Sequence, residues 1–324
     1  MAGEQVPGPS RIGLGLAAVA RPGYITSGRG ADLGDARDVA QLRHRSHELL
    51  DMAYAAGVRY VDVARSYGRA EEFLAAWLAA RPDVDDVVIG SKWGYRYVGD
   101  WQLDAAVHEV KDHSLEAFGE QLELSRQLLG GRLAIYHVHS ATIESPALSD
   151  RQLHRALGDL RDAGTRVGIS TSGPAQAEAV RRALAVSVDG RALFTSFEST
   201  WNLLEPSAGP ALSEAASAGA RVIVKEVVAN GRLVPGVGDA APAAVASAEL
   251  ARELGVGVDQ VAVAAALAQP WAWRVLSGAV TARQLTENLG GELVRLGPGV
   301  VAGLADLSED PRQYWADRSA RPWT

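Results

Sequence analysis

Eight short apolar segments alternate with helical patterns along the chain, and this alternation constrains the fold more than any other feature. Each segment is rich in Val, Ile or Leu and is bounded by Gly, Pro or polar residues, which is typical of buried strands. Alternating strands and helices predict a parallel sheet with crossover helices, and eight strands can close a barrel. The predicted strands span residues 11–16, 58–63, 86–91, 133–138, 166–170, 193–197, 221–225 and 273–277.

No low-complexity linker divides the sequence, so we expect one domain over residues 1–324, an α/β fold built as a single (β/α)8 (TIM-type) barrel. Residues 1–10 are expected to form a loose N-terminal arm. The polar tail over residues 308–324 carries three aromatic residues, so it is expected either to pack over the barrel mouth or to fray. The predicted helices span residues 39–56, 70–80, 115–129, 150–163, 175–184, 210–218, 243–254, 258–268 and 282–289.

The charge pattern and composition exclude several classes of protein. The net charge is −7 and the basic residues form no block, so nucleic acid is not an expected partner. No apolar run reaches about 18 residues, so no membrane span is predicted. Cys is absent, which excludes disulfides and thiolate sites. Residues 18–20 resemble a signal-peptide cleavage site, but the preceding region is not basic enough, and we expect a cytoplasmic protein. The sequence does not indicate the oligomeric state.

Lysine is rare in this chain, which has three lysines against 29 arginines. A lysine inside an apolar strand therefore indicates chemistry that needs a compact ammonium with a tunable pKa, which Arg cannot supply. Lys92 ends one predicted strand, Asp62 and His139 end two others, and Tyr67 follows five residues after Asp62. Because active sites of (β/α)8 barrels lie at the C-terminal strand ends, these four side chains are expected to form one proton-transfer site.

The expected site suits general acid catalysis by a phenol. A phenol with a pKa of about 10 is a poor acid at neutral pH, but a nearby ammonium lowers that pKa. Asp62 would keep a buried Lys92 charged, and neutral His139 could hold a substrate carbonyl oxygen near Tyr67. General acid catalysis contributes about 10²–10⁴-fold to a rate. These residues predict proton donation to a carbonyl oxygen while another group supplies hydride to the carbon.

Several segments resemble the aldo-keto reductase family. Within residues 57–68, an Asp and a Tyr-Gly pair are separated by four residues, as in the family's signature. Residues 90–92 resemble its lysine strand, and residues 135–139 resemble its histidine strand. Residues 167–170, 278–279 and 284–288 also match, in the expected order along the chain.

The resemblance implies an NADPH-dependent oxidoreductase that reduces an aldehyde or ketone to an alcohol on a (β/α)8 barrel. Tyr67 would be the general acid, Lys92 and Asp62 would lower its pKa, and His139 would orient the carbonyl. The cofactor would lie extended across the barrel mouth, and the partner would be a small-molecule carbonyl substrate.

The resemblance also implies a set of cofactor-binding residues, with NADPH as the expected cofactor and NADH as the alternative. Thr171 stands where the family usually has an Asn, and Glu198 stands where it usually has a nicotinamide-binding Gln. Lys225 replaces an aromatic residue that stacks on the nicotinamide. Since the frequent phosphate-binding Lys is absent, Arg283 and Gln284 are the candidates for contacts with a 2′-phosphate. The implied set is Ser170, Thr171, Glu198, Lys225, Gly278, Thr281, Arg283, Gln284 and Asn288.

Aromatic residues on loops near the expected mouth, namely Tyr24, Trp93 and Tyr95, are predicted to line the substrate pocket. Aromatic walls suit apolar and sugar-like substrates alike. The particular aldehyde or ketone, and the physiological direction of the reaction, are therefore not predicted.

Three alternative interpretations remain at this stage. Residues 13–18 match the G-x-G-x-x-A dinucleotide fingerprint, but Arg21-Pro22-Gly23 interrupts the helix that this motif should open. His137 and His139 point to one face of a strand and suggest a divalent metal, but no His follows residue 154, so no metal is expected. The unusual nicotinamide contacts also suit a catalytically weak subunit that senses a cofactor or binds a partner.

Overall fold

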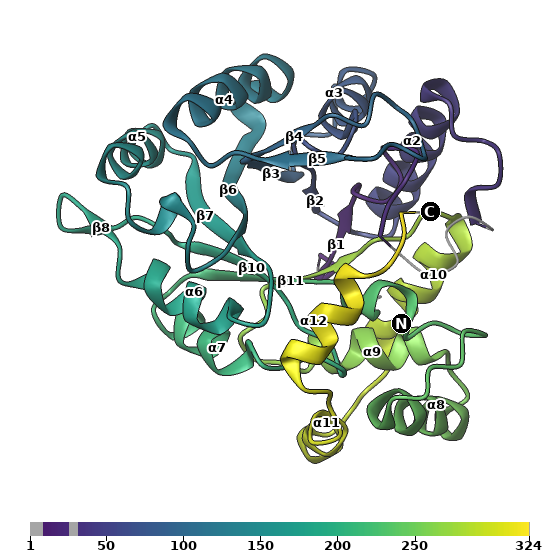
Figure 1. The fold of residues 1–324 in the computed structure, drawn as a ribbon. Helices are drawn as coiled ribbons and strands as arrows, with labels where there is room; N and C mark the ends of the chain where they lie inside the picture. Colours follow the sequence, from purple (N-terminus) through teal and green to yellow (C-terminus); the bar gives the residue numbers. More distant parts are fainter. Residues whose placement is uncertain (1–8, 26–31, 324) are drawn as a thin grey trace, which may run out of the picture.

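The computed structural model describes residues 9–25 and 32–323, and its centre is a closed barrel of eight parallel strands (Figure 1). The strand order around the barrel is β1-β12-β11-β10-β7-β6-β3-β2. The predicted (β/α)8 barrel is therefore confirmed, with all eight strands near their expected positions. The strands are β1 (Ile12–Gly15), β2 (Tyr60–Asp62), β3 (Val88–Trp93), β6 (Leu133–Ala141), β7 (Arg166–Thr171), β10 (Ser196–Thr200), β11 (Arg221–Lys225) and β12 (Arg274–Ser277).

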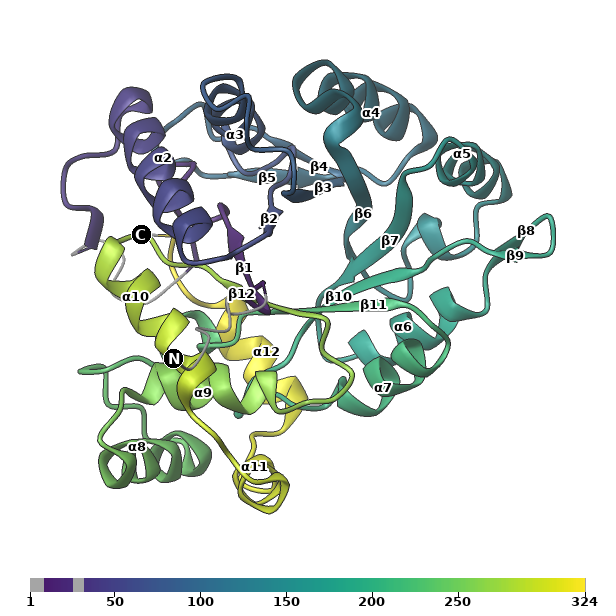
Figure 2. The ribbon, with the colours of Figure 1, turned by 180° about the vertical axis from the view of Figure 1, so that it is seen from behind.

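Helices surround the barrel on its outer side (Figures 1 and 2). Each predicted helix is present within one or two residues of its expected ends. Several helices begin at a side-chain cap. The side chains of Asp38, Ser114 and Asp150 accept hydrogen bonds from backbone N–H groups of the first turn, which have no carbonyl partner within the helix. The helices are α2 (Val39–Ala55), α3 (Ala70–Ala79), α4 (Leu115–Leu129), α5 (Arg151–Asp162), α6 (Gln176–Leu184), α7 (Gly209–Ser217), α8 (Pro242–Leu254), α9 (Val258–Leu267) and α10 (Ala282–Gly290).

The structure also contains elements that the sequence analysis did not predict. Two antiparallel pairs extend from the barrel, β4 (Tyr95–Tyr97) with β5 (Glu109–Lys111) and β8 (Ser187–Val188) with β9 (Arg191–Ala192). Two helices, α11 (Pro298–Ala305) and α12 (Pro311–Ser319), follow the last barrel helix. The short 3-10 helices among the described residues are η1 (Gly130–Arg132), η2 (Pro146–Leu148), η3 (Ala229–Gly231) and η4 (Gly291–Leu293).

The C-terminal tail packs against the mouth of the barrel. Helix α12 crosses in front of the strands in Figure 1 and lies behind them in Figure 2. Tyr314 is buried and its hydroxyl accepts a hydrogen bond from Asn202 Nδ2 at 3.0 Å, just after β10. Further along, Trp323 stacks on His108 with ring centroids 4.2 Å apart. Of the two expectations for the tail, packing therefore holds for residues 311–323, whereas residues 1–8 of the expected N-terminal arm lie outside the described residues.

Layers of inward-pointing side chains fill the barrel and set the height of the site. Tyr60, Ile135, Ile223 and Leu276 form a separate apolar cluster inside the barrel. The backbone of β3 must pass close to this layer, because a Cβ on Gly90 would lie 2.2 Å from the Tyr60 hydroxyl. Since side chains alternate along a strand, the residues two positions after those of this apolar cluster also point inward, closer to the mouth. The mouth layer thus includes Asp62, His137, Lys225 and the open position at Gly278.

No helix in residues 9–25 and 32–323 combines the length and the apolar character needed to cross a membrane.

Candidate functional site

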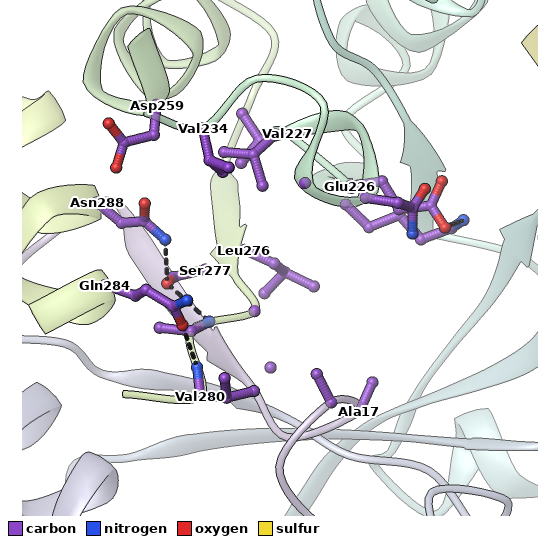
Figure 3. Close-up of a pocket in the computed structure, with 18 of the residues that line it drawn as sticks. Ala17, Glu226, Val227, Val234, Asp259, Leu276, Ser277, Val280, Gln284 and Asn288 are labelled. Carbon is purple, nitrogen blue, oxygen red and sulfur yellow. Dashed lines mark hydrogen bonds and ion pairs between the residues drawn. The ribbon is translucent and has the colours of Figure 1, made fainter. Parts of the chain in front are cut away.

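A cavity of about 290 Å³ opens at the C-terminal ends of the barrel strands (Figure 3). One end of it reaches the predicted catalytic residues Asp62 and Tyr67. The other end reaches the first turns of α10, where Gln284 and Asn288 lie on one side and Glu226 on the opposite side (Figure 3). Figure 3 also shows Ala17, Val227, Val234, Asp259, Leu276, Ser277 and Val280 around this cavity.

A buried cluster of charges lies at the catalytic end of the cavity. Lys92 is 0% exposed, and its ammonium forms a hydrogen-bonded ion pair with the Asp62 carboxylate on the neighbouring strand. The same ammonium lies 3.2 Å from Glu198 Oε2 on β10. These three side chains meet because each points into the barrel from its strand. The predicted Lys92–Asp62 pair is thus present, and Glu198 joins it.

The two carboxylates and the ammonium shift one another's pKa values. Burial alone would lower the pKa of Lys92, but Asp62 and Glu198 outweigh that effect and raise it well above its ordinary value. Lys92 is therefore a permanent cation at neutral pH. Burial and the adjacent Glu198 carboxylate raise the pKa of Asp62 to about 8, although Lys92 acts in the opposite direction.

Tyr67 lies on the loop after β2, over the charge cluster. The loop turns sharply at Gly68, whose φ is 58° and where a Cβ would lie 2.5 Å from the Ala20 carbonyl oxygen, so only glycine fits. The Lys92 ammonium is 5.0 Å from the centroid of the Tyr67 ring. The Tyr67 hydroxyl is 3.4 Å from His139 Nε2, and the two rings meet edge to face. The structure therefore brings all four predicted catalytic residues together.

The electrostatics of Tyr67 differ from the sequence-based expectation in one respect. Burial raises the pKa of Tyr67 well above 10, and Lys92 offsets only part of that increase. Lys92 acts to lower this pKa, as expected, but burial and Asp62 act to raise it, so the net shift is upward. Tyr67 consequently holds its proton firmly at neutral pH, as a proton donor must before reaction.

His139 is held as a neutral imidazole. Burial lowers its pKa well below 6.5, and the nearby cations Lys92 and Arg21 lower it further. Its Nδ1 is 3.3 Å from the Ser66 hydroxyl, while Nε2 faces Tyr67. The expected neutral state of His139 therefore agrees with its surroundings.

The predicted cofactor residues separate into two groups. Six of them line the cavity: Glu198, Lys225, Gly278, Arg283, Gln284 and Asn288. The other three are engaged elsewhere. The Ser170 hydroxyl accepts from the Ser140 backbone N–H at 2.8 Å, and the Thr171 hydroxyl bonds to Ser199 at 2.7 Å. Thr281 caps α10 by accepting from the Gln284 N–H at 3.2 Å.

The cavity wall near α10 is organised by side-chain hydrogen bonds. Asn288 donates to the Ser277 hydroxyl at 2.8 Å (Figure 3). Gln284 accepts from the Val280 N–H at 2.9 Å and donates to the Asp32 carboxylate at 2.7 Å. Arg283, by contrast, is 71% exposed and pairs with Glu287 on its own helix at 3.0 Å.

The residues predicted to line the substrate pocket differ in position. Tyr24 lines the cavity, and the Tyr95 ring lies edge-on to His139 with centroids 5.1 Å apart. Trp93 does not face the mouth. It is 0% exposed and packs against Phe118 and His113 on the outer side of the barrel. Trp93 follows the inward-pointing Lys92 directly, so strand alternation turns it outward.

Two buried charge pairs near the mouth were not predicted from the sequence. Arg21, 2% exposed, pairs with Glu109 at 2.6 Å and lies against the rings of Tyr24, Tyr67 and Trp323. Among 29 arginines, nothing in its local sequence distinguishes it. The second pair is formed by Glu226, directly after β11, and Arg318 of α12. Arg318 donates hydrogen bonds to both carboxylate oxygens of Glu226.

The strand that carries His139 also carries His137. His137 is fully buried, and its Nε2 bonds to the Ser196 hydroxyl at 2.9 Å. Burial lowers the pKa of His137 to about 4, so it is neutral. Among residues 9–25 and 32–323, no group of three or more His, Cys, Asp or Glu side chains is arranged to hold a metal ion.

Comparisons with known proteins agree with this geometry. The model of the aldo/keto reductase family matches residues 31–308. The holo form of an aldo-keto reductase from Bacillus halodurans superposes with a TM-score of 0.67 at 18% identity, covering 93% of each chain. A provisionally named aldo-keto reductase from Pseudomonas aeruginosa gives a TM-score of 0.62 at 20% identity, covering 87% of this chain and 89% of that one. No curated protein matches the sequence significantly. The structural likenesses establish the fold, and because the family model spans most of the sequence, the chain belongs to the aldo/keto reductase family.

Proposed function

We propose that this protein reduces an aldehyde or ketone to an alcohol with NADPH, using Tyr67 as the general acid. The family implies an NAD(P)H-dependent oxidoreductase with a small carbonyl substrate. One observation carries the finer assignment: the Tyr67 hydroxyl faces neutral His139 at 3.4 Å and Lys92 lies against its ring, all at one end of the cavity. A cytoplasmic location is part of the same proposal.

In this proposal the protein residues control one proton. Tyr67 starts protonated because burial raises its pKa. When bound, the reduced nicotinamide supplies hydride to the carbonyl carbon. Tyr67 donates its proton to the oxygen, which becomes a strongly basic alkoxide as hydride arrives. The Lys92 ammonium favours the phenolate that remains, since opposite charges attract strongly in a buried site.

His139 orients the substrate in this proposal. A neutral imidazole can donate through Nε2 to a carbonyl oxygen without repelling nearby cations. Because burial and the neighbouring Lys92 keep the imidazole neutral, it holds the oxygen beside the Tyr67 hydroxyl and does not compete as the acid. Tyr24 and Tyr95 lie close enough to form an aromatic wall for the carbonyl's substituents.

The cavity fits an extended dinucleotide. It runs from Tyr67 to the first turns of α10. Its floor is flat at Gly278, where a Cβ would meet nothing within 4 Å and would project into open space. Backbone N–H groups at a helix N-terminus favour phosphate. In the proposed binding mode Gln284, Asn288 and Arg283 hold the adenosine end, with Arg283 beside the 2′-phosphate of NADPH.

The experiment is an assay of NADPH oxidation with a panel of aliphatic and aromatic aldehydes and ketones, together with fluorescence titration of NADPH. We expect turnover that depends on Tyr67 and binding that does not. Tight binding of NADPH and NADH with no turnover of any carbonyl would instead support the second candidate, a cofactor-sensing or partner-binding subunit.

The position of Lys225 favours the second candidate, the cofactor-sensing or partner-binding subunit. Lys225 lines the cavity, and its ammonium is fixed by a 2.9 Å hydrogen bond to the Thr200 hydroxyl. A cation beside the nicotinamide opposes the positive charge of the oxidised ring. The site would then bind reduced cofactor more tightly than oxidised cofactor, which suits a sensor as well as a reductase.

A further inference from the structure

The catalytic end of the cavity contains one carboxylate more than a lysine–aspartate pair requires. Asp62 and Glu198 are 2% and 1% exposed, and both contact the single ammonium of Lys92. Two carboxylates and one ammonium leave one uncompensated negative charge inside the barrel. An unpaired buried charge is costly, and neighbouring carboxylates relieve that cost by sharing a proton.

Within the described residues, the His and Tyr side chains that face this cluster carry no positive charge. His137 Nδ1 lies 3.9 Å from Glu198 Oε2, but burial keeps His137 neutral. Tyr60 and Tyr67, which also face the cluster, are uncharged at neutral pH because burial raises the pKa of each well above 10. His139, the other titratable group that faces Lys92, is neutral as well.

Lys225 is the remaining cation near Glu198, and it belongs to a different group. It donates to Thr200 and lies 3.9 Å from Glu226, a carboxylate that also binds Arg318. The Lys225, Glu226 and Arg318 group already carries one net positive charge around its own carboxylate. Within the described residues, no ion pair joins Lys225 to Glu198, so Lys92 is the cation that directly contacts both Asp62 and Glu198.

The hydrogen-bonding pattern indicates where an additional proton fits. Within the described residues, Asp62 Oδ1 is a buried oxygen without a hydrogen-bond partner, and Glu198 Oε2 has its ion-pair contact with Lys92 but no aligned hydrogen bond. Buried acceptors without a donor are rare in proteins. Asp62 and Glu198 are close enough for a side-chain hydrogen bond, so a proton on one carboxyl group gives the other an O–H donor and makes the three-residue cluster neutral overall.

We infer that Asp62, Lys92 and Glu198 hold one shared proton, and that Glu198 is the positioning residue that keeps this proton in the site. The inference rests on the proposed function only for its use in turnover. After Tyr67 gives its proton to the substrate oxygen, the shared proton keeps the three-residue cluster neutral, so the Lys92 ammonium can stabilise the phenolate without an additional carboxylate charge opposing it. Product leaves with one hydride and one proton added, and Tyr67 regains its proton from solvent.

The test is the pH dependence of kcat/KM in the wild type and in Glu198→Gln. Gln has the size of Glu and can still accept from Lys92, but it cannot hold the shared proton. We expect the wild-type rate to fall about tenfold between about pH 7 and about pH 9, as the pair loses its proton. In Glu198→Gln we expect a rate about tenfold lower at about pH 7 and nearly constant up to about pH 9.

The matched control is Glu205→Gln, another buried glutamate that contacts Gln176, Ser207 and Trp315 but not Lys92. It should keep the wild-type pH dependence. A Glu198→Gln profile that falls in parallel with the wild type at every pH would overturn the inference, since a purely structural role lowers the rate equally throughout.

Infrared difference spectroscopy of the wild-type protein tests the inference without turnover. Titration from about pH 6 to about pH 10 should remove one protonated-carboxyl band, and Asp62→Asn should abolish that band. Absence of such a band in the folded wild type would overturn the shared proton. Failure to reduce any carbonyl would count against the proposed function and leave this spectroscopic result to decide the inference.

Discussion

The two ends of the cavity are built in different ways. At the catalytic end, Asp62, Lys92 and Glu198 are inward residues of barrel strands, and each is buried against the others. At the α10 end, the candidate contacts are helix and loop residues, and Arg283 is 71% exposed. In the proposed mechanism the barrel holds these charges in place during proton transfer, whereas the side chains of the proposed cofactor end can adapt in water. Substitutions should therefore have large effects at the first end and small effects at the second.

The largest effect is expected for Lys92→Met. Removing the ammonium leaves Asp62 and Glu198 facing each other inside the barrel without their cation. We expect the free energy of unfolding to fall by about 3–5 kcal/mol, as when one partner of a buried pair is removed. Turnover should be lost as well. Urea denaturation measures the loss of stability. The control is Lys111→Met in β5, which should change stability by less than about 0.5 kcal/mol.

Tyr67→Phe should lower kcat by about 10²–10⁴-fold, because the proposed general acid is removed from an otherwise intact site. Binding of NADPH, followed by fluorescence, should stay within a few-fold of the wild-type value. The control is Tyr136→Phe on β6, whose hydroxyl bonds to Ser125 away from the cavity. A Tyr67→Phe enzyme with nearly wild-type kcat would show that another group donates the proton.

The catalytic end was largely predictable because it depends on the period of the strands. Lys92, Asp62 and His139 each follow an apolar run, and alternation points all three inward near the mouth of a barrel. The same rule turns Trp93 outward, one residue after Lys92, although an aromatic residue near a strand end was expected to face the substrate. Glu198 was expected to contact the cofactor, and its ion pair with Lys92 could not be predicted from residues so far apart in the sequence.

The cover of the mouth was not predictable in detail. Arg21 meets Glu109 of the β4–β5 hairpin, and Glu226 meets Arg318 of α12. Each pair joins segments far apart in the sequence. Neither α12 nor the hairpin has a strong apolar period, so their places follow from contacts that exist only once the barrel has formed.

The Glu226–Arg318 pair tests whether the tail stabilises the cavity wall. Although burial acts to raise the pKa of Glu226, Arg318 and Lys225 outweigh it and lower the pKa to about 2. Because the ordinary value is 4.5, this pair stabilises the fold above about pH 4.5, and that contribution is lost as the pH falls towards 2.

Replacing Arg318 should therefore cost stability mainly at neutral pH. We expect Arg318→Met to lose about 3 kcal/mol near pH 7, because a buried carboxylate loses a bidentate partner. The loss should shrink below about pH 4.5, where Glu226 of the variant becomes protonated. Thermal unfolding across this pH range measures both effects. Arg312→Met, on the exposed face of the same helix, should give the wild-type pH dependence, and a loss of equal size at every pH would mean that Arg318 acts through packing alone.

The smallest effect is expected at the exposed end of the cavity. Arg283 pairs with Glu287 in water, and exposed ion pairs contribute about 0–1 kcal/mol, so its removal should leave the fold unchanged. If Arg283 contacts a 2′-phosphate, Arg283→Ala should weaken NADPH binding by about five- to tenfold and NADH binding by less than about twofold. Fluorescence titration with both cofactors measures this difference, with Arg295→Ala as the control. Equal weakening of NADPH and NADH binding would show that Arg283 does not contact the 2′-phosphate. The acidic residues Asp32, Asp259 and Glu287, which line the same cavity, would then favour a cofactor with a free 2′-hydroxyl. Carboxylates accept hydrogen bonds from hydroxyls and repel phosphate.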